Sequence, residues 1–235
     1  MKEKEKRSGE GISLFLGRLF SHISPLLLAN VLFVVCSLPV ITAGPSLLAL
    51  CRIASLAVRD ENIDTAREFF RTWKKEFKAG LLLNLTLIPL TVLVTLSALR
   101  ALRVLLLEGW STQAVLAFVL YLLLTAYSMY LLPLAVCMDA PLSVIAKNAL
   151  LLCFANGLKT LLGSVFCGAV LLAGLAGYPY SFPLLLLILF ALAAYIACFF
   201  GWNAAERFVF RPYYEAHPED PRAEEFLSAT ENEQV

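Results

Sequence analysis

Charged residues fall into three blocks of this 235-residue sequence, and long stretches almost without charge run between the blocks. Most of the charge lies in residues 1–18, 59–78 and 206–235. Apolar residues make up 60% of the chain and charged residues only 16%, below the roughly 25% of soluble domains. Because a soluble helix needs a polar face, helices built from these stretches must face lipid or one another. The sequence therefore predicts an all-α, polytopic membrane helical bundle.

The predicted bundle has about six apolar segments. Four of them are close to the roughly 20 residues that cross a bilayer, and they cover residues 79–99, 114–138, 158–176 and 182–204. The other two, 25–38 and 45–58, each rise about 21 Å, which is less than the roughly 30 Å hydrocarbon core. Each of these two either spans a thinned region of the bilayer, or the pair re-enters the membrane as a hairpin.

A turn separates the two short segments. It contains Pro39, Thr42, Gly44 and Pro45, and two prolines and a glycine this close together interrupt a helix. We therefore expect a broken-helix hairpin over residues 23–58.

The rest of the chain divides by charge and hydropathy into regions of different kinds. We expect an N-terminal segment at 1–22, an amphipathic interfacial helix at 59–78, a four-helix membrane region at 79–204 with a connector at 139–157, and a polar tail at 205–235. The N-terminal segment contains a short amphipathic stretch that either lies in the membrane interface or packs on the protein.

The helix within 59–78 combines aromatic and basic residues at helical spacing. Asp64 is a plausible N-cap. The aromatic residues and the basic residues among them give a candidate interface or partner surface, which comprises Phe69, Phe70, Arg71, Trp73, Lys74 and Phe77. An aromatic stripe with a cationic counter-face is typical of a helix in the membrane interface, and the same face is available to a partner protein.

The distribution of lysine and arginine predicts the orientation. If 23–58 is a hairpin, all of the 19 basic residues except Arg52, Arg100 and Arg103 share one side. Basic residues favour the cytoplasmic side of a membrane. We therefore expect both termini in the cytoplasm.

Three polar residues lie within apolar segments. Arg52 would contact lipid headgroups or the end of a neighbouring helix, or would extend its side chain toward a thinned edge of the membrane. Asn30 and Asn84 would bridge helices or line a polar path. No acidic residue stands in these segments, which weakens a proton-coupled transporter with a carboxylate relay.

Small residues recur every four positions in the last two apolar segments. They are Ser164, Gly168, Ala193, Ala197, Gly201 and Ala205. Small residues at this spacing let helix backbones approach closely in lipid. Packing within the molecule is the first interpretation, and self-association is the second.

The sequence contains no pattern that indicates an enzyme. Six cysteines lie in apolar surroundings without a CxxC pair, and the two histidines are far apart. No nucleophile–base set, metal-ligand cluster or phosphate-binding glycine loop is present. We expect no cofactor, no metal and no nucleic-acid partner, since the net charge is only +1.

Two stretches resemble a known family. Residues 37–45, Ser-Leu-Pro-Val-Ile-Thr-Ala-Gly-Pro, resemble a signature of the YesL-like family of bacterial membrane proteins, and residues 68–78, Glu-Phe-Phe-Arg-Thr-Trp-Lys-Lys-Glu-Phe-Lys, resemble its second signature. The resemblance implies a small helical protein of the bacterial plasma membrane, encoded near genes for carbohydrate uptake and glycan degradation. It implies no catalytic residues.

Two functions follow as expectations. The first is a non-enzymatic accessory to carbohydrate uptake that sits in the lipid bilayer and contacts a carbohydrate transporter. The second is a small stand-alone transporter or channel, because interrupted helices often line binding sites.

Overall fold

A computed structural model describes residues 13–216, except residues 108, 110 and 139. The described residues form helices and no strand. The helices are Ser13–Ser21, α2 (Ile23–Cys36), η1 (Val40–Thr42), α3 (Ala43–Val58), α4 (Thr65–Lys75), α5 (Phe77–Leu107), α6 (Thr112–Cys137), α7 (Leu142–Ala155), α8 (Gly157–Ala176), α9 (Phe182–Leu184), η2 (Leu185–Leu189), α10 (Phe190–Ala205), η3 (Glu206–Phe210) and α11 (Arg211–Ala216). The predicted charged lead and most of the predicted tail lie outside the described residues.

The all-α membrane fold that the sequence predicts is confirmed. Five helical stretches among the described residues are long and apolar enough to cross a membrane, and a sixth is possible if Ser13–Ser21 and α2, bent by 66°, form one span. The apolar part of α5 between Lys78 and Arg100 rises about 33 Å, which matches the roughly 30 Å hydrocarbon core. These two basic positions therefore fit the two edges of the core.

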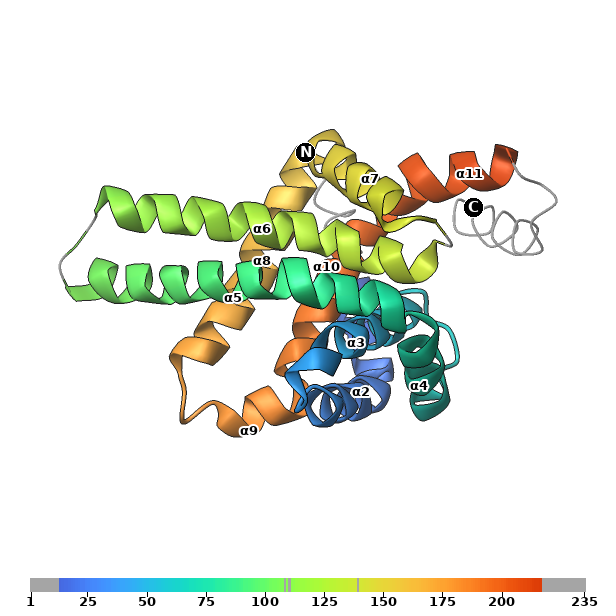
Figure 1. Ribbon diagram of the computed structural model, residues 1–235, viewed down its shortest axis with the longest axis horizontal. Coiled ribbons are helices and arrows are strands. Elements are labelled where there is room, and N and C mark those ends of the chain that lie inside the picture. Colours follow the sequence, from blue (N-terminus) through green and yellow to red (C-terminus); the bar gives the residue numbers. More distant parts are fainter. Residues whose placement is uncertain (1–12, 108, 110, 139, 217–235) are drawn as a thin grey trace.

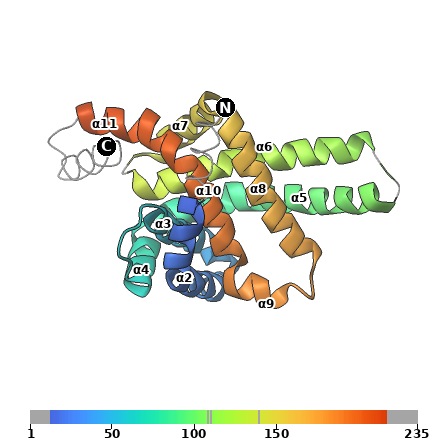
Figure 2. The same cartoon turned by 180° about the vertical axis from the view of Figure 1, so that it is seen from behind.

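Helices α5 and α6 form an antiparallel pair along the long axis of the molecule, and α8 and α10 form a second antiparallel pair that crosses it (Figures 1 and 2). The hydroxyl of Tyr130 lies 2.7 Å from that of Thr160, and Tyr121 donates to the Gly168 carbonyl over 3.1 Å. Between the two contacts the residue numbers fall along α6 and rise along α8, so these two helices are antiparallel. The α4 end of the bundle is therefore the end where α5 and α8 begin and α6 and α10 finish.

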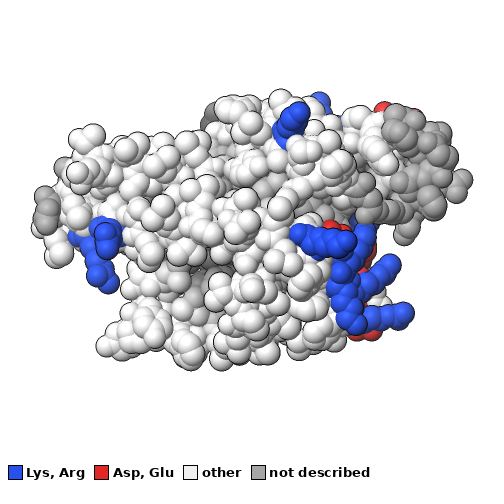
Figure 3. All heavy atoms as spheres, in the orientation of Figure 1, with Lys and Arg blue, Asp and Glu red and all other residues white. Residues whose placement is uncertain are grey.

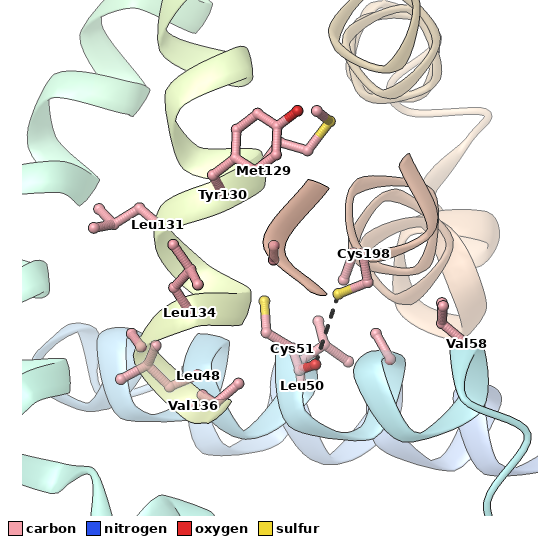
Figure 4. Close-up of a cluster of buried hydrophobic side chains, with 14 of the residues drawn as sticks. Leu48, Leu50, Cys51, Val58, Met129, Tyr130, Leu131, Leu134, Val136 and Cys198 are labelled. Carbon is pink, nitrogen blue, oxygen red and sulfur yellow. Dashed lines mark hydrogen bonds between the residues drawn. The ribbon is translucent and has the colours of Figure 1, made fainter. Parts of the chain in front are cut away.

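Helix α3 lies across the α4 end of the bundle. Gly44 at its start touches Gly80 in the first turn of α5, Arg52 in its middle reaches Cys137 at the end of α6, and Ser55 lies 3.5 Å from Cys198 of α10. In Figure 4, α3 runs across the picture and α6 descends onto it. If α3 crossed the membrane beside α5, the two helices would instead pack side by side along their lengths. Helix α3 thus packs against the start of α5, the end of α6 and the middle of α10, and is almost fully buried.

The two ends of the α2–α3 hairpin lie next to each other. Arg18, just before α2, donates from Nη1 to the carbonyl of Val58 over 2.6 Å. His22 Nε2 lies 2.8 Å from Asp60 Oδ1, just after α3. The chain therefore enters and leaves the hairpin at one place.

Two boundaries differ from the sequence prediction. Helix α5 extends to Leu107, well beyond the predicted end at residue 99. The predicted polar tail begins at 205, but the chain stays helical to Ala216, and Phe210 and Tyr214 are buried. These two aromatic side chains join the main core, which explains why the helix continues past the last apolar segment.

Candidate functional site

The turn of the hairpin is held by the side chain of Thr42. Its hydroxyl Oγ1 lies 2.5 Å from the carbonyl oxygen of Cys36 and 2.7 Å from that of Pro39. Pro39 lacks an amide proton, so the chain cannot continue the α2 hydrogen-bond pattern there. The hydroxyl has a single proton, and the Pro39 carbonyl also accepts from the backbone amide of Thr42 over 2.8 Å. The hydroxyl can therefore serve the Cys36 carbonyl, which the end of α2 leaves without a helical partner.

Asn84 of α5 satisfies the next two carbonyls of the same turn. Its Nδ2 donates to Val40 over 3.0 Å and to Ile41 over 3.3 Å. Unpaired backbone carbonyls are costly in lipid, where no water replaces the missing donor. The structure thus gives Asn84 a bridging position between α5 and the turn.

Gly44 and Gly80 form a direct contact between the backbones of α3 and α5. A Cβ on Gly80 would lie 2.6 Å from Cα and 2.8 Å from Cδ of Pro45, and a Cβ on Gly44 would lie 2.8 Å from the carbonyl carbon of Gly80. No side chain fits between the two helices here. The start of α3 is therefore fixed on the first turn of α5.

Helix α4 has one face buried in the protein and one face exposed. Asp64 caps it, since its Oδ1 accepts from the backbone amide of Arg67 over 3.4 Å. The buried face carries Thr65, Phe69 and Thr72. Trp73 donates from Nε1 to Ser46 Oγ over 3.3 Å, which attaches the last turn of α4 to the start of α3. The two stretches that resemble family signatures therefore lie against each other.

The predicted aromatic stripe is divided by this packing. Phe69 is fully buried, so it is not available to a partner or to lipid. Phe77 belongs to α5 and packs on Trp73, with ring centroids 5.1 Å apart. Phe70, Arg71 and Lys74 are exposed. The prediction of one aromatic face was thus wrong, because α4 turns most of its aromatic rings toward the protein.

Basic side chains gather on the exposed face of α4 and the start of α5 (Figure 3). They are Arg67, Arg71, Lys74, Lys75 and Lys78. Arg71 pairs with Glu68 at 3.2 Å, and Lys75 with Glu76 at 3.7 Å. This cationic face is the most strongly charged surface among the described residues.

Arg52 contacts the end of a neighbouring helix. Its Nη1 lies 4.0 Å from Sγ of Cys137, the last residue of α6. Arg59, just beyond the end of α3, lies over the ring of Trp202 at 5.3 Å. A cation near a helix C-terminus is favourable because the last carbonyls carry partial negative charge. Of the roles considered for Arg52, the structure shows the helix-end contact.

Asn30 is fully buried and makes three hydrogen bonds to the break at the start of α10. Its Nδ2 donates to the carbonyls of Leu185 (3.0 Å) and Leu186 (2.7 Å), and its Oδ1 accepts from the amide of Ala191 (2.8 Å). The segment Leu185–Leu189 is a π-helix, whose altered pairing leaves backbone groups without helical partners. Asn30 supplies those partners and joins α2 to α10.

The small residues of α8 and α10 lie mostly at contacts inside the molecule. A Cβ on Gly168 would meet the ring of Tyr121 at 2.8 Å, and one on Gly201 would meet the carbonyl oxygen of Met129 at 3.1 Å. Ser164, Ala193 and Ala205 are buried, and the half-buried Ala197 packs against both core clusters. These positions serve packing within the chain.

Sequence reasoning missed several residues of the site. Gly80 was not singled out, although it makes the closest backbone contact of the hairpin. Gly163 and Gly174 were also missed, and they pack on Phe200 and Leu189. A glycine in an otherwise bulky apolar helix was the available signal. No sequence pattern around Arg18 and His22, which join the hairpin ends, predicts that they contact Val58 and Asp60.

The residues described above form a surface region around the turn of the hairpin and α4. Among the described residues, no group of three or more His, Cys, Asp or Glu is arranged to hold a metal ion. The amides Asn30 and Asn84 already bind backbone groups. What this region presents outward is the cationic face of α4 and the apolar surface around the turn.

Comparison with known proteins gives one match. Residues 26–98, 73 of the 235, match the model of a family described as "Protein of unknown function, DUF624". No curated protein and no solved structure matches the chain. The YesL-like proteins are members of the DUF624 family. The matched region, which holds the hairpin, α4 and most of α5, is thus similar to a family whose description assigns no activity.

Proposed function

We propose that this protein is a non-enzymatic integral membrane protein of the bacterial plasma membrane that assists carbohydrate uptake by contacting a transporter. The resemblance of residues 37–45 and 68–78 to the YesL-like signatures supports the bacterial setting and the link to sugar import. The proposed contact surface is the exposed face of α4.

The observation that carries this proposal is that one face of α4 is fixed to the protein and the other is exposed. Phe69 and Trp73 fix its inner face to the hairpin, while Phe70, Arg71 and Lys74 face outward. A preformed helix loses little conformational entropy on binding, and exposed aromatic and arginine side chains are enriched at protein interfaces. The exposed face of α4 is therefore suited to a protein partner.

A stand-alone transporter or channel is the second candidate. The π-helical break at Leu185–Leu189 supports it, because interrupted helices often line substrate sites. The side chain of Asn30, however, already hydrogen-bonds to backbone groups of that break. We therefore favour the accessory role. Sugar flux into vesicles reconstituted with the purified protein would instead support the stand-alone transporter.

We also propose that both termini and α4 face the cytoplasm. The two ends of the hairpin lie together at Arg18–Val58 and His22–Asp60, so the chain returns to the side it came from. This leaves nearly all basic residues on one side, as the positive-inside rule favours. Tags at the amino terminus and at residue 70 should react from the same side, and reaction from opposite sides would contradict this orientation.

Co-purification tests the accessory role. The chain is isolated from native membranes after gentle solubilisation, and carbohydrate-transporter subunits in the eluate are identified by mass spectrometry. The double variant Phe70→Ala/Arg71→Glu should lose the transporter. The matched control is Phe154→Ala/Lys159→Glu, which changes an exposed phenylalanine and an exposed lysine elsewhere at the α4 end. Absence of any transporter with the unchanged protein would reject the proposal.

A further inference from the structure

An exposed apolar surface surrounds the turn of the hairpin. Val40 is 76% exposed and Ile41 is 65% exposed. Leu85 of α5 is 77% exposed, and Leu81 is exposed one turn earlier. The carbonyls of Val40 and Ile41 bind Asn84, so the turn lies directly beside this part of α5. The turn and α5 together form one continuous apolar patch.

Basic residues border this patch on one side. Lys78 lies three and seven positions before Leu81 and Leu85, which places all three on one face of α5. At 100° per residue, the two leucines lie between Lys78 and Asn84 around the helix. The contact of Trp73 with Ser46 brings the last turn of α4, with Lys74, to the start of α3. Lys78 therefore borders the apolar patch, and Lys74 lies four positions before it, in the last turn of α4.

These two lysines carry positive charge that is not neutralised nearby. Both are exposed, and among the residues that the structure describes no carboxylate lies within ion-pair distance of either. Lys75, between them in sequence, does pair with Glu76. Lys74 and Lys78 are thus free to bind an anion.

We propose that this surface is a binding site for an anionic diacyl phospholipid. The phosphate would lie at Lys74 and Lys78, and an acyl chain would lie along Leu81, Leu85, Val40 and Ile41. The rise from Lys78 to Leu85 is about 10 Å, which leads from headgroup level into the acyl-chain region. A free phosphate would use only the lysines, and an acidic protein segment would leave the apolar patch uncovered. A lipid matches both parts.

Lipid titration of the purified full-length protein in a neutral detergent tests the site. Bound lipid is counted by native mass spectrometry with dioleoyl phosphatidylglycerol, dioleoyl phosphatidylcholine, glycerol phosphate or a polyglutamate peptide as the probe. Phosphatidylglycerol should bind more tightly than the other three. In Lys74→Gln/Lys78→Gln its affinity should fall roughly twenty-five-fold, about fivefold for each lysine replaced.

The matched control is Arg100→Gln/Arg103→Gln, which removes two basic residues at the opposite end of α5. It should keep the affinity of the unchanged protein. Equal binding of the two lipids, or unchanged binding by the lysine variant, would overturn the site. Equal binding of glycerol phosphate would overturn the acyl-chain contact, and equal binding of the peptide would overturn the lipid in favour of an acidic protein segment. The lysines are exposed, and an unchanged melting temperature without lipid verifies that the variant is folded.

Discussion

The substitution Gly80→Ala tests the backbone contact that holds the hairpin in place. The added Cβ would lie 2.6 Å from Cα and 2.8 Å from Cδ of Pro45. The opposing atoms belong to the backbone and to a proline ring, so no flexible side chain can move aside. Overpacking of this kind costs about 1–3 kcal/mol. We therefore expect the free energy of unfolding, measured by titrating SDS into mixed micelles, to fall by that amount.

The control is Gly157→Ala at the start of α8. A Cβ there would meet nothing within 4 Å. Alanine favours a helix over glycine by up to about 1 kcal/mol, so this variant should be neutral or more stable. The two alanine variants should thus differ by about 1–4 kcal/mol. If Gly80→Ala is as stable as Gly157→Ala, then the start of α3 is not fixed on the first turn of α5.

Four other predictions concern the same region and its surroundings. Asn30→Leu should lower the free energy of unfolding by about 2–5 kcal/mol, since it removes three hydrogen bonds in the membrane, and a loss below about 1 kcal/mol would contradict this. Asn84→Leu removes two such bonds and should cost about 1–3 kcal/mol in the same SDS titration, so a neutral result would mean that the turn carbonyls find other donors. Burial raises the pKa of the Cys153 thiol to about 11, so in a variant that keeps only this cysteine maleimide labelling should accelerate about tenfold per pH unit from pH 7 to 10. A rate that levels off near pH 9 would refute the raised pKa. In a cysteine-free background, Val40→Cys should resist a charged maleimide from both sides of the membrane, whereas labelling from outside would show that the hairpin spans.

The sequence was sufficient to locate the helices but not the direction of α3. Residues 45–58 have the composition of a short membrane span, and a rule based on length and hydropathy accepts Val40–Val58 as one. Composition reports that a helix avoids water, not whether lipid or protein surrounds it. The direction of α3 depends on contacts with Gly80, Cys137 and Cys198, which are distant in sequence.

Helix α4 shows the same limit on a smaller scale. Periodicity placed Phe69, Phe70, Trp73 and Phe77 on a helix, but neighbouring aromatic residues point in directions that differ by about 100°. Phe69 became core and Phe70 remained exposed because α3 covers only one side of α4. Which residues form the outward surface could be decided only once the partner of the buried face was known.

The hydrogen bonds of the hairpin argue for a re-entrant element rather than two spans. Asn84 donates to the carbonyls of Val40 and Ile41, and the single hydroxyl proton of Thr42 serves the carbonyl of either Cys36 or Pro39. In water these carbonyls would need no such donors, and the exposed side chains of Val40 and Ile41 would be unfavourable. In hydrocarbon both features are required. Asn84 is six residues beyond Lys78, so the turn lies about 9 Å along α5 from that basic position. We therefore predict that four helices cross the membrane and that the α2–α3 hairpin enters it from one side.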